Sequence, residues 1–305
     1  MAAPRIVVVG SSNTDMVIKM DRLPGPGETL IGDEFIMAAG GKGANQAVAA
    51  ARLGGKVTFI ARVGRDIFGQ QAIEGFAKEE ICTDFIVQDE VSPSGVALIF
   101  VDQNGENSIG VASGANGRLS TKDVSAAQVE FEAMNVLLLQ LETPIETVRY
   151  AASSARKMGV MVILNPAPAR PLDDDLLRNV TVLTPNESEA GLLTGVSVTD
   201  GASAEEAAKK LKQRGVKNVI ITLGAKGALV VNEEGAQLVP SKEVQAVDTT
   251  AAGDAFNGAL AFALAKGEPM IEAVRFANLT GALSATRMGA QPSMPTLEEL
   301  QEFAR

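Results

Sequence analysis

Short apolar runs alternate along the chain with longer segments whose apolar positions recur at helical spacing. Runs of strand length that are rich in Val, Ile and Leu are typical of strands buried on both faces of a parallel sheet. Their alternation with helices indicates successive β-α-β units. The candidate core strands are Ile6–Val9, Val57–Ile60, Val136–Leu139, Val160–Leu164, Val180–Leu183 and Val219–Thr222. The pattern predicts an α/β fold, a three-layer αβα sandwich around a mainly parallel central sheet.

Local signals predict some of the element boundaries. Thr143–Glu146, Ser203–Glu206 and Thr296–Glu299 each have the spacing of a capping box, in which two side chains satisfy backbone groups of a first helical turn. The alternating run Val244–Val247 predicts a further strand.

Two segments interrupt the alternation of strands and helices. Residues 16–38 and 94–111 contain extended pieces joined by Gly, Pro and Asn turns, and neither segment is followed by its own helix. They predict a small antiparallel β lid that projects from the main body. We therefore expect a single domain over residues 1–305, with the lid as a small subdomain.

Composition and charge exclude several classes of function. Apolar residues make up 46% of the chain and charged residues 21%, as in ordinary globular proteins. The net charge is −10 and there is no long basic run, so we expect no nucleic-acid partner, because binding to phosphates needs clustered Lys and Arg. No apolar run approaches the roughly 20 residues that span a bilayer, so no membrane partner is expected.

Cysteine and histidine usage narrows the chemistry. Cys82 is the only cysteine, so no intrachain disulfide can form, which fits a reducing compartment. Residues 1–10 lead from one Arg directly into a short apolar strand, without the layout of a signal peptide, and we expect a cytoplasmic protein. The absence of histidine excludes Ser-His and Cys-His catalytic pairs and His-based zinc sites.

Polar side chains gather where the candidate strands end, and ligands of open α/β sheets bind along that edge. They are Asn13, Asp15, Glu142, Asn165, Asn186, Glu189 and, with a glycine turn, Gly224. The edge is therefore the predicted site.

The strongest single motif is Asp248–Gly258, which opens a long helix rich in Ala and Leu. The small residues Ala251–Gly253 allow backbone amides to approach a ligand, and a helix N-terminus favours anions. Asp254 is then either a helix-stabilising acid or a catalytic carboxylate beside an anion-binding turn. The small residues directly before it favour the second interpretation.

Two further glycine motifs precede it. Gly40–Gln46 is not a Walker A loop, because Lys42 is not followed by Ser or Thr, and no dinucleotide fingerprint follows the first strand. The glycines alone predict a tight turn, but Lys42 and Asn45 also suit the hydroxyls of a polar ligand. By itself Thr222–Gly227 is only weak evidence for a ligand site, because many turns have such a sequence. Its place at the predicted site edge favours a nucleotide role.

Together these motifs resemble the ribokinase family of carbohydrate kinases, from Arg5 to about Pro295. Both family signatures occur in order, as Gly40–Gln46 and Asp248–Asp254, with Asn165–Ala169 and Thr184–Glu187 between them. The wider family often has Gly-Ala-Gly-Asp where this chain has Ala-Ala-Gly-Asp. The resemblance implies in-line transfer of the γ-phosphoryl group of ATP, with Mg²⁺, to O5 of ribose. It makes Asp254 the catalytic base, and the anion hole would consist of Ala251, Ala252 and Gly253.

The resemblance also implies three sets of ligand contacts. The sugar contacts would be Asn13, Asp15, Gly41, Lys42, Gly43, Asn45, Glu142 and Asp254. The nucleotide contacts would be Asn186, Glu189, Thr222, Leu223, Gly224, Ala225, Lys226, Gly227, Gly253 and Asn278. Asn186 and Glu189 would organise Mg²⁺ through water. A K⁺ ion would be held, mostly by main-chain oxygens, at Asp248, Thr250, Ser284, Arg287, Gly289 and Ser293, and would stabilise the anion hole.

The resemblance further implies a homodimer formed through the lid. It does not decide which molecule accepts the phosphoryl group: ribose, 2-deoxyribose, a nucleoside or another sugar. A difference of one hydroxyl can change the preferred substrate without changing any motif. A non-catalytic sugar or nucleotide sensor on the same fold is a different class of function, against which Asp254 and its small-residue turn argue. The missing fingerprint argues against a Rossmann-type dehydrogenase.

Overall fold

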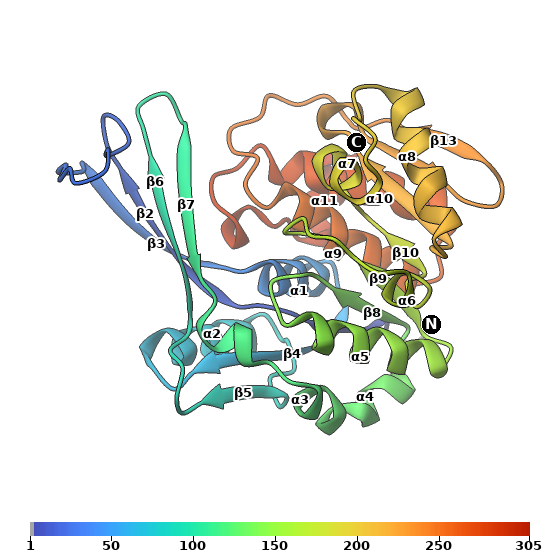
Figure 1. Ribbon diagram of the computed structural model, residues 1–305, viewed down its shortest axis with the longest axis horizontal. Helices are drawn as coiled ribbons and strands as arrows, with labels where there is room; N and C mark the ends of the chain where they lie inside the picture. Colours follow the sequence, from blue (N-terminus) through green and yellow to red (C-terminus); the bar gives the residue numbers. More distant parts are fainter. Residues whose placement is uncertain (1–2) are drawn as a thin grey trace.

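The computed structural model describes residues 3–305 (Figure 1); Met1 and Ala2, at the start of the predicted domain, lie outside the described residues. Within residues 3–305 the central sheet has nine strands in the order β13-β12-β11-β10-β9-β8-β1-β4-β5. Neighbouring strands are parallel from β11 to β5 and antiparallel from β11 to β13. The predicted α/β class and mainly parallel sheet are confirmed. No helix within this range is long and apolar enough to cross a membrane.

All the predicted core strands form, with small shifts at their ends. The strands of the central sheet are β1 (Arg5–Val9), β4 (Lys56–Gly64), β5 (Ile86–Asp89), β8 (Val136–Leu139), β9 (Met161–Leu164), β10 (Val182–Leu183), β11 (Asn218–Thr222), β12 (Ala228–Val231) and β13 (Ala236–Val239). The strand predicted at Val244–Val247 is wrong. This segment is irregular, and the N–H of Val247 donates to the carbonyl of Ala285, 2.8 Å away, instead of to a neighbouring strand.

Helices cover both faces of the sheet, which gives the three-layer sandwich. They are α1 (Lys42–Arg52), α2 (Ile67–Lys78), α3 (Thr121–Ala126), α4 (Gln128–Ala133), α5 (Ile145–Lys157), α6 (Asp174–Leu177), α7 (Glu187–Thr194), α8 (Gly201–Gln213), α9 (Ala252–Ala265), α10 (Met270–Ser284) and α11 (Leu297–Phe303). Successive strand residues point to opposite faces. Val7 and Val9 therefore pack with the layer of α3 to α8, whereas Ile6 and Val8 pack with α1, α2 and α9 to α11.

The three predicted helix starts have different outcomes. The capping box at Thr296–Glu299 is confirmed and begins α11. The start of α8 lies earlier than predicted, because Asp200 is the N-cap and Ser203 is its partner in the box. The box predicted at the start of α5 is wrong, because Pro144 is the N-cap and the hydroxyl of Thr143 is buried without a partner.

A second sheet projects from one side of the main body (Figure 1), and we call it the lid sheet. Its strands, in spatial order, are β3 (Glu34–Gly40), β2 (Asn13–Lys19), β6 (Gly95–Val101) and β7 (Asn107–Ala112). The pairs β2-β3 and β6-β7 are antiparallel, as predicted, but the inner strands β2 and β6 are parallel. Both inner strands leave the main body in the same direction, β2 after β1 and β6 after β5, and this accounts for their parallel pairing.

The contact between α1 and α9 requires a glycine at position 258. A Cβ atom there would lie 2.6 Å from Cβ of Ala49 and 2.7 Å from the carbonyl oxygen of Gln46. Gly258→Ala should lower the free energy of unfolding by about 1–3 kcal/mol, because the added methyl group forces the two helices apart. Urea denaturation measures this change.

The matched control is Gly75→Ala in α2, where a Cβ atom would meet nothing within 4 Å. There the better helix propensity of alanine should raise stability by up to about 1 kcal/mol. Equal effects of the two substitutions would contradict the close packing of α1 against α9.

Candidate active site

Asp254 lies in the first turn of α9, at the predicted edge of the central sheet, and is 6% exposed. Side chains of α1 hold both of its carboxylate oxygens. Nδ2 of Asn45 donates to Oδ2 over 3.0 Å, and Nε2 of Gln46 donates to Oδ1 over 2.9 Å. The carboxylate therefore has one fixed orientation at the point where α1 and α9 meet.

A second row of buried amides fixes Gln46 in turn. Oε1 of Gln46 accepts a 2.6 Å hydrogen bond from Gln140, and its Nε2 also donates to Oδ1 of Asn165 over 3.1 Å. Gln46 and Gln140 are fully buried. Sequence reasoning assigned neither residue a role, although a polar Gln140 within the apolar stretch of β8 and Leu141 was an available signal, because buried polar groups need partners.

The electrostatics of the site centre on one cation among several carboxylates. Burial raises the pKa of the Asp254 carboxyl, whereas the charge of Lys42 and the two donated hydrogen bonds act in the opposite direction. Burial alone would lower the pKa of the Lys42 amine, but the carboxylates around it, led by Asp254 and Glu142, raise it. Lys42 therefore stays charged, and a raised pKa makes Asp254 a stronger base than an exposed carboxylate.

The predicted sugar contacts lie together around Asp254. Oε2 of Glu142 accepts hydrogen bonds from the backbone N–H of Lys42, over 2.9 Å, and from the Ser11 hydroxyl. Gly41 has a φ of 90°, and a Cβ atom there would lie 2.7 Å from the Asn13 nitrogen, so only glycine fits. Burial, with the negative charges of Glu142 and Asp254, raises the pKa of Asp15 to about 6.

The N-terminus of α9 supplies free donors beside this polar pocket. Ala251 has a left-handed conformation with a φ of 58°, which turns the chain sharply into the helix. Of the predicted anion-hole residues, Ala252 donates its N–H to the carbonyl of Thr249 over 3.2 Å, whereas no described residue accepts a hydrogen bond from the N–H of Gly253 or of the next residue, Asp254. Such donors at a helix start form a binding site for an anionic group.

A cavity of 780 Å³ opens on the other side of this helix start. Of the predicted nucleotide contacts it is lined by Asn186, Thr222, Gly224, Ala225, Gly227, Gly253 and Asn278. Leu223, Lys226 and Glu189 do not line it. Leu223 faces the core, and Glu189 forms a capping box with Asn186 at the start of α7. Sequence reasoning missed the stretch Ser241–Ala246, which contributes to the cavity wall, because it interpreted part of it as a strand.

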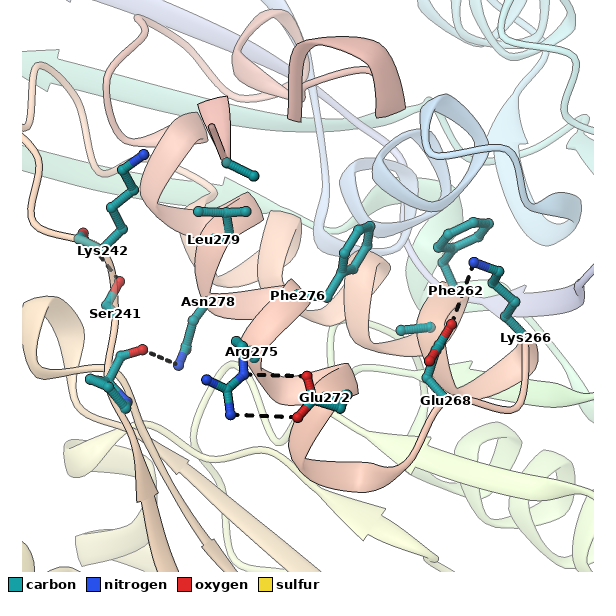
Figure 2. A pocket seen from close by; sticks show the side chains of 13 residues that line it. Ser241, Lys242, Phe262, Lys266, Glu268, Glu272, Arg275, Phe276, Asn278 and Leu279 are labelled. Carbon is teal, nitrogen blue, oxygen red and sulfur yellow. Dashed lines mark hydrogen bonds and ion pairs between the residues drawn. The ribbon is translucent and has the colours of Figure 1, made fainter. Parts of the chain in front are cut away.

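A smaller cavity of 510 Å³ lies on α9 and α10 (Figure 2). The two cavities share Ser241, Lys242 and Asn278. Figure 2 shows two ion pairs in it, Arg275 with Glu272 at 3.3 Å and Lys266 with Glu268 at 3.4 Å, whereas Lys242 is not paired with any of the residues drawn. Arg275 and Lys266 are thus neutralised, and neither Asp254 nor Gly253 lines this cavity. Of the two cavities, only the larger one is lined by Gly253 and therefore adjoins the free N–H groups at the start of α9.

The predicted K⁺ loop residues lie behind the start of α9. Asp248 accepts from the N–H groups of Thr250, at 2.9 Å, and Gly289, at 2.8 Å. The hydroxyls of Ser284 and Ser293 are 2.7 Å apart and buried. The Arg287 side chain is paired with Glu299 at 3.0 Å, which leaves only its main chain for the loop. Residues 3–305 contain no group of three or more His, Cys, Asp or Glu suited to a metal ion.

Asp254 is a buried carboxylate with a raised pKa, and it lies between side chains suited to a polyol and an anion-binding helix start. This arrangement defines a site for phosphoryl transfer to a hydroxyl group. The chain belongs to the pfkB family of carbohydrate kinases, whose family model matches residues 3–297. The resemblance predicted from the motifs is thereby confirmed, and it disfavours the dehydrogenase alternative.

Individual relatives span nearly the whole chain. The protein is 47% identical to a ribokinase of Haemophilus influenzae over 98% of this chain and 97% of the relative. It is 40% identical to a deoxyribokinase of Salmonella typhi, over 98% of both chains. It is similar to the structure of Arabidopsis thaliana ribokinase complexed with ribose and ATP, with a TM-score of 0.92 and 32% identity over 100% of this chain and 99% of that one.

Proposed function

We propose that the protein transfers the γ-phosphoryl group of ATP to O5 of D-ribose, giving ribose 5-phosphate and ADP. The observation that carries the proposal is the place of Asp254, which lies between polyol-suited side chains and the free N–H groups at the start of α9. The 47% identity to a ribokinase and the similarity to a ribokinase complexed with ribose and ATP support the choice of both substrates.

In the proposed reaction, Asp254 accepts the proton of the primary hydroxyl while that oxygen attacks the γ-phosphorus. The new O–P bond forms as the bond to the β-phosphate oxygen breaks, and ADP leaves. The N–H groups of Gly253 and Asp254, together with the Lys42 ammonium, stabilise the negative charge that develops on the transferring group. The protein therefore acts by positioning and charge neutralisation.

Two metal ions belong to the proposal. Mg²⁺ would neutralise charge on the phosphates, and the buried Glu189 with Asn186 at the cavity edge fits a role in holding its water ligands. K⁺ would be held by oxygens of Asp248, Thr250, Ser284, Arg287, Gly289 and Ser293. The contacts of Asp248 with both halves of this loop support that arrangement.

The rate of ADP release should be higher in K⁺ than in Na⁺. Equal rates in the two cations would remove the K⁺ site from the proposal.

The first test is ADP release by the purified protein with MgATP and K⁺, comparing D-ribose with 2-deoxyribose, fructose and adenosine. Turnover that depends on ribose supports the proposal. Preference for 2-deoxyribose would support the alternative favoured by the 40% identity to a deoxyribokinase. ATP binding without turnover on any acceptor would overturn the proposed activity and favour a sensor.

The KM for ribose should rise as the pH falls through about 6, because the pKa of Asp15 is raised to about 6. Above that pH the carboxylate is ionised and accepts hydrogen bonds from sugar hydroxyls, and below it protonation weakens this interaction. Asp15→Asn should have a higher KM that no longer changes in this range. Steady-state KM values across the pH range provide the measurement, and a flat wild-type KM would contradict the role of Asp15.

We also propose a homodimer formed through the face of the lid sheet that points away from Asp15. By strand register this face carries Met16, Ile18, Phe35, Met37, Leu98 and Phe100. Exposed apolar clusters of this kind mark interaction surfaces. Leu98→Glu should convert the dimer into a monomer, as measured by light scattering after gel filtration.

The matched control is Leu192→Glu in α7, because Leu98 and Leu192 are each 50% exposed. The control should remain dimeric. A wild-type protein that is monomeric, or a Leu98→Glu variant that stays dimeric, would contradict the proposed interface.

We further propose that residues 3–305 form one domain with the lid sheet as its mobile part, and that the protein works in the cytoplasm. The lone Cys82 suits a reducing compartment, and ATP is available there. Cell fractionation tests the location.

A further inference from the structure

Asn116 lies at the base of the lid sheet, in the short helical turn Gly114–Arg118 that follows β7, and is 1% exposed. Its side-chain amide pairs with the backbone of Ser12 in two directions. Oδ1 accepts from the Ser12 N–H over 2.9 Å, and Nδ2 donates to the Ser12 carbonyl over 3.0 Å. Asn116 thus binds the residue directly before β2 as a neighbouring strand would.

The same amide determines the orientation of Asn13. Nδ2 of Asn116 donates to Oδ1 of Asn13 over 2.7 Å. Because this oxygen is occupied, Nδ2 of Asn13 is left as a hydrogen-bond donor, and none of the hydrogen bonds among residues 3–305 uses it. A sugar hydroxyl is an acceptor of the kind this donor requires.

Asn116 also lies against β6 and directly follows β7. A Cβ atom at Gly95, the first residue of β6, would overlap both Nδ2 of Asn116 and Oδ1 of Asn13. The beginnings of β2 and β6 and the end of β7 therefore meet at this one buried amide. A shift of the lid sheet at its base would change the hydrogen bond that orients Asn13.

We propose that Asn116 is a positioning residue for the sugar. It holds the Asn13 amide with its donor toward the substrate and joins that orientation to the base of the lid sheet. The inference rests on the proposed function, because it takes Asn13 as a sugar contact. Preorganisation of a polar contact acts on substrate binding, so its loss should appear in KM for the sugar rather than in KM for ATP.

The test is a double-mutant cycle of Asn116→Ala and Asn13→Ala, assayed with the sugar that the wild type phosphorylates best. Asn116→Ala alone should raise the sugar KM by about tenfold, with little change in kcat or in KM for ATP. In the Asn13→Ala background the same substitution should change the sugar KM by less than about twofold, because residues in contact are not additive.

Equal increases in both backgrounds, or a loss confined to kcat, would overturn the inference. If Asn116→Ala does not fold by thermal denaturation, Asn116→Asp takes its place in the cycle. It keeps the acceptor for the Ser12 N–H but sets an oxygen against both the Ser12 carbonyl and Oδ1 of Asn13. Only the second contact is absent from the Asn13→Ala background, so the rise in sugar KM should be smaller there. Failure of the proposed function is distinguishable, since the wild type itself would then phosphorylate no sugar.

Discussion

Asp254→Asn is expected to lower kcat by about 10²- to 10⁴-fold, the contribution of a positioned general base. The amide cannot accept the hydroxyl proton. It also sets an NH₂ group against one of the two donors, Asn45 or Gln46, that hold the carboxylate oxygens. Both effects act on the reacting hydroxyl and leave the larger cavity, proposed to hold the nucleotide, unchanged, because Asp254 does not line it.

Stopped-flow or steady-state ADP release measures kcat, and calorimetry with an ATP analogue measures nucleotide affinity, which should stay within about threefold of wild type. The matched control is Asp175→Asn, the same chemical change at a side chain that is 86% exposed on α6. It should leave kcat unchanged. A near-normal kcat for Asp254→Asn would remove Asp254 from the role of base.

The layers of the fold were predictable because the core strands are buried on both faces and are therefore apolar at nearly every position. The run Val136–Leu139 is an example, since its alternate side chains enter both hydrophobic clusters. The same logic failed at Val244–Val247, whose alternating pattern is that of a half-buried strand. There Val247 is bonded to Ala285 at the end of α10, and Val244 and Ala246 line the larger cavity, so the segment pairs with no strand.

The polar edge of the site was predictable from the positions of strand ends, but its supporting contacts were not. Asn13 and Asp254 can be assigned to the site from their motifs and their positions after strands alone. Asn116 contacts Ser12 and Asn13 across 104 and 103 residues of sequence, and nothing local distinguishes it from an ordinary turn residue. The capping box predicted at Thr143–Glu146 was wrong for a related reason, because the Thr143 hydroxyl is buried by tertiary packing despite the capping-box spacing.

Lys42→Met is expected to lower kcat/KM for the sugar by about 10²- to 10³-fold, the usual effect of removing one electrostatic contact to a developing charge. The substitution leaves the carboxylates of Asp15, Glu142 and Asp254 without the cation between them. Because Lys42 lowers the pKa of both Asp254 and Asp15, its removal raises these two pKa values further. The base is then protonated over a wider range of pH.

The sign of the pH effect separates this role of Lys42 from simple substrate binding. The acidic limb of the kcat/KM profile reports the pKa of the base in the free enzyme, so in Lys42→Met it should move to higher pH. Part of the lost rate should therefore return on the alkaline side. The control is Lys209→Met, an exposed lysine paired with Glu205 on α8, which should leave the profile unchanged. A uniform loss of rate with an unmoved limb would mean that Lys42 binds substrate but does not set the basicity of Asp254.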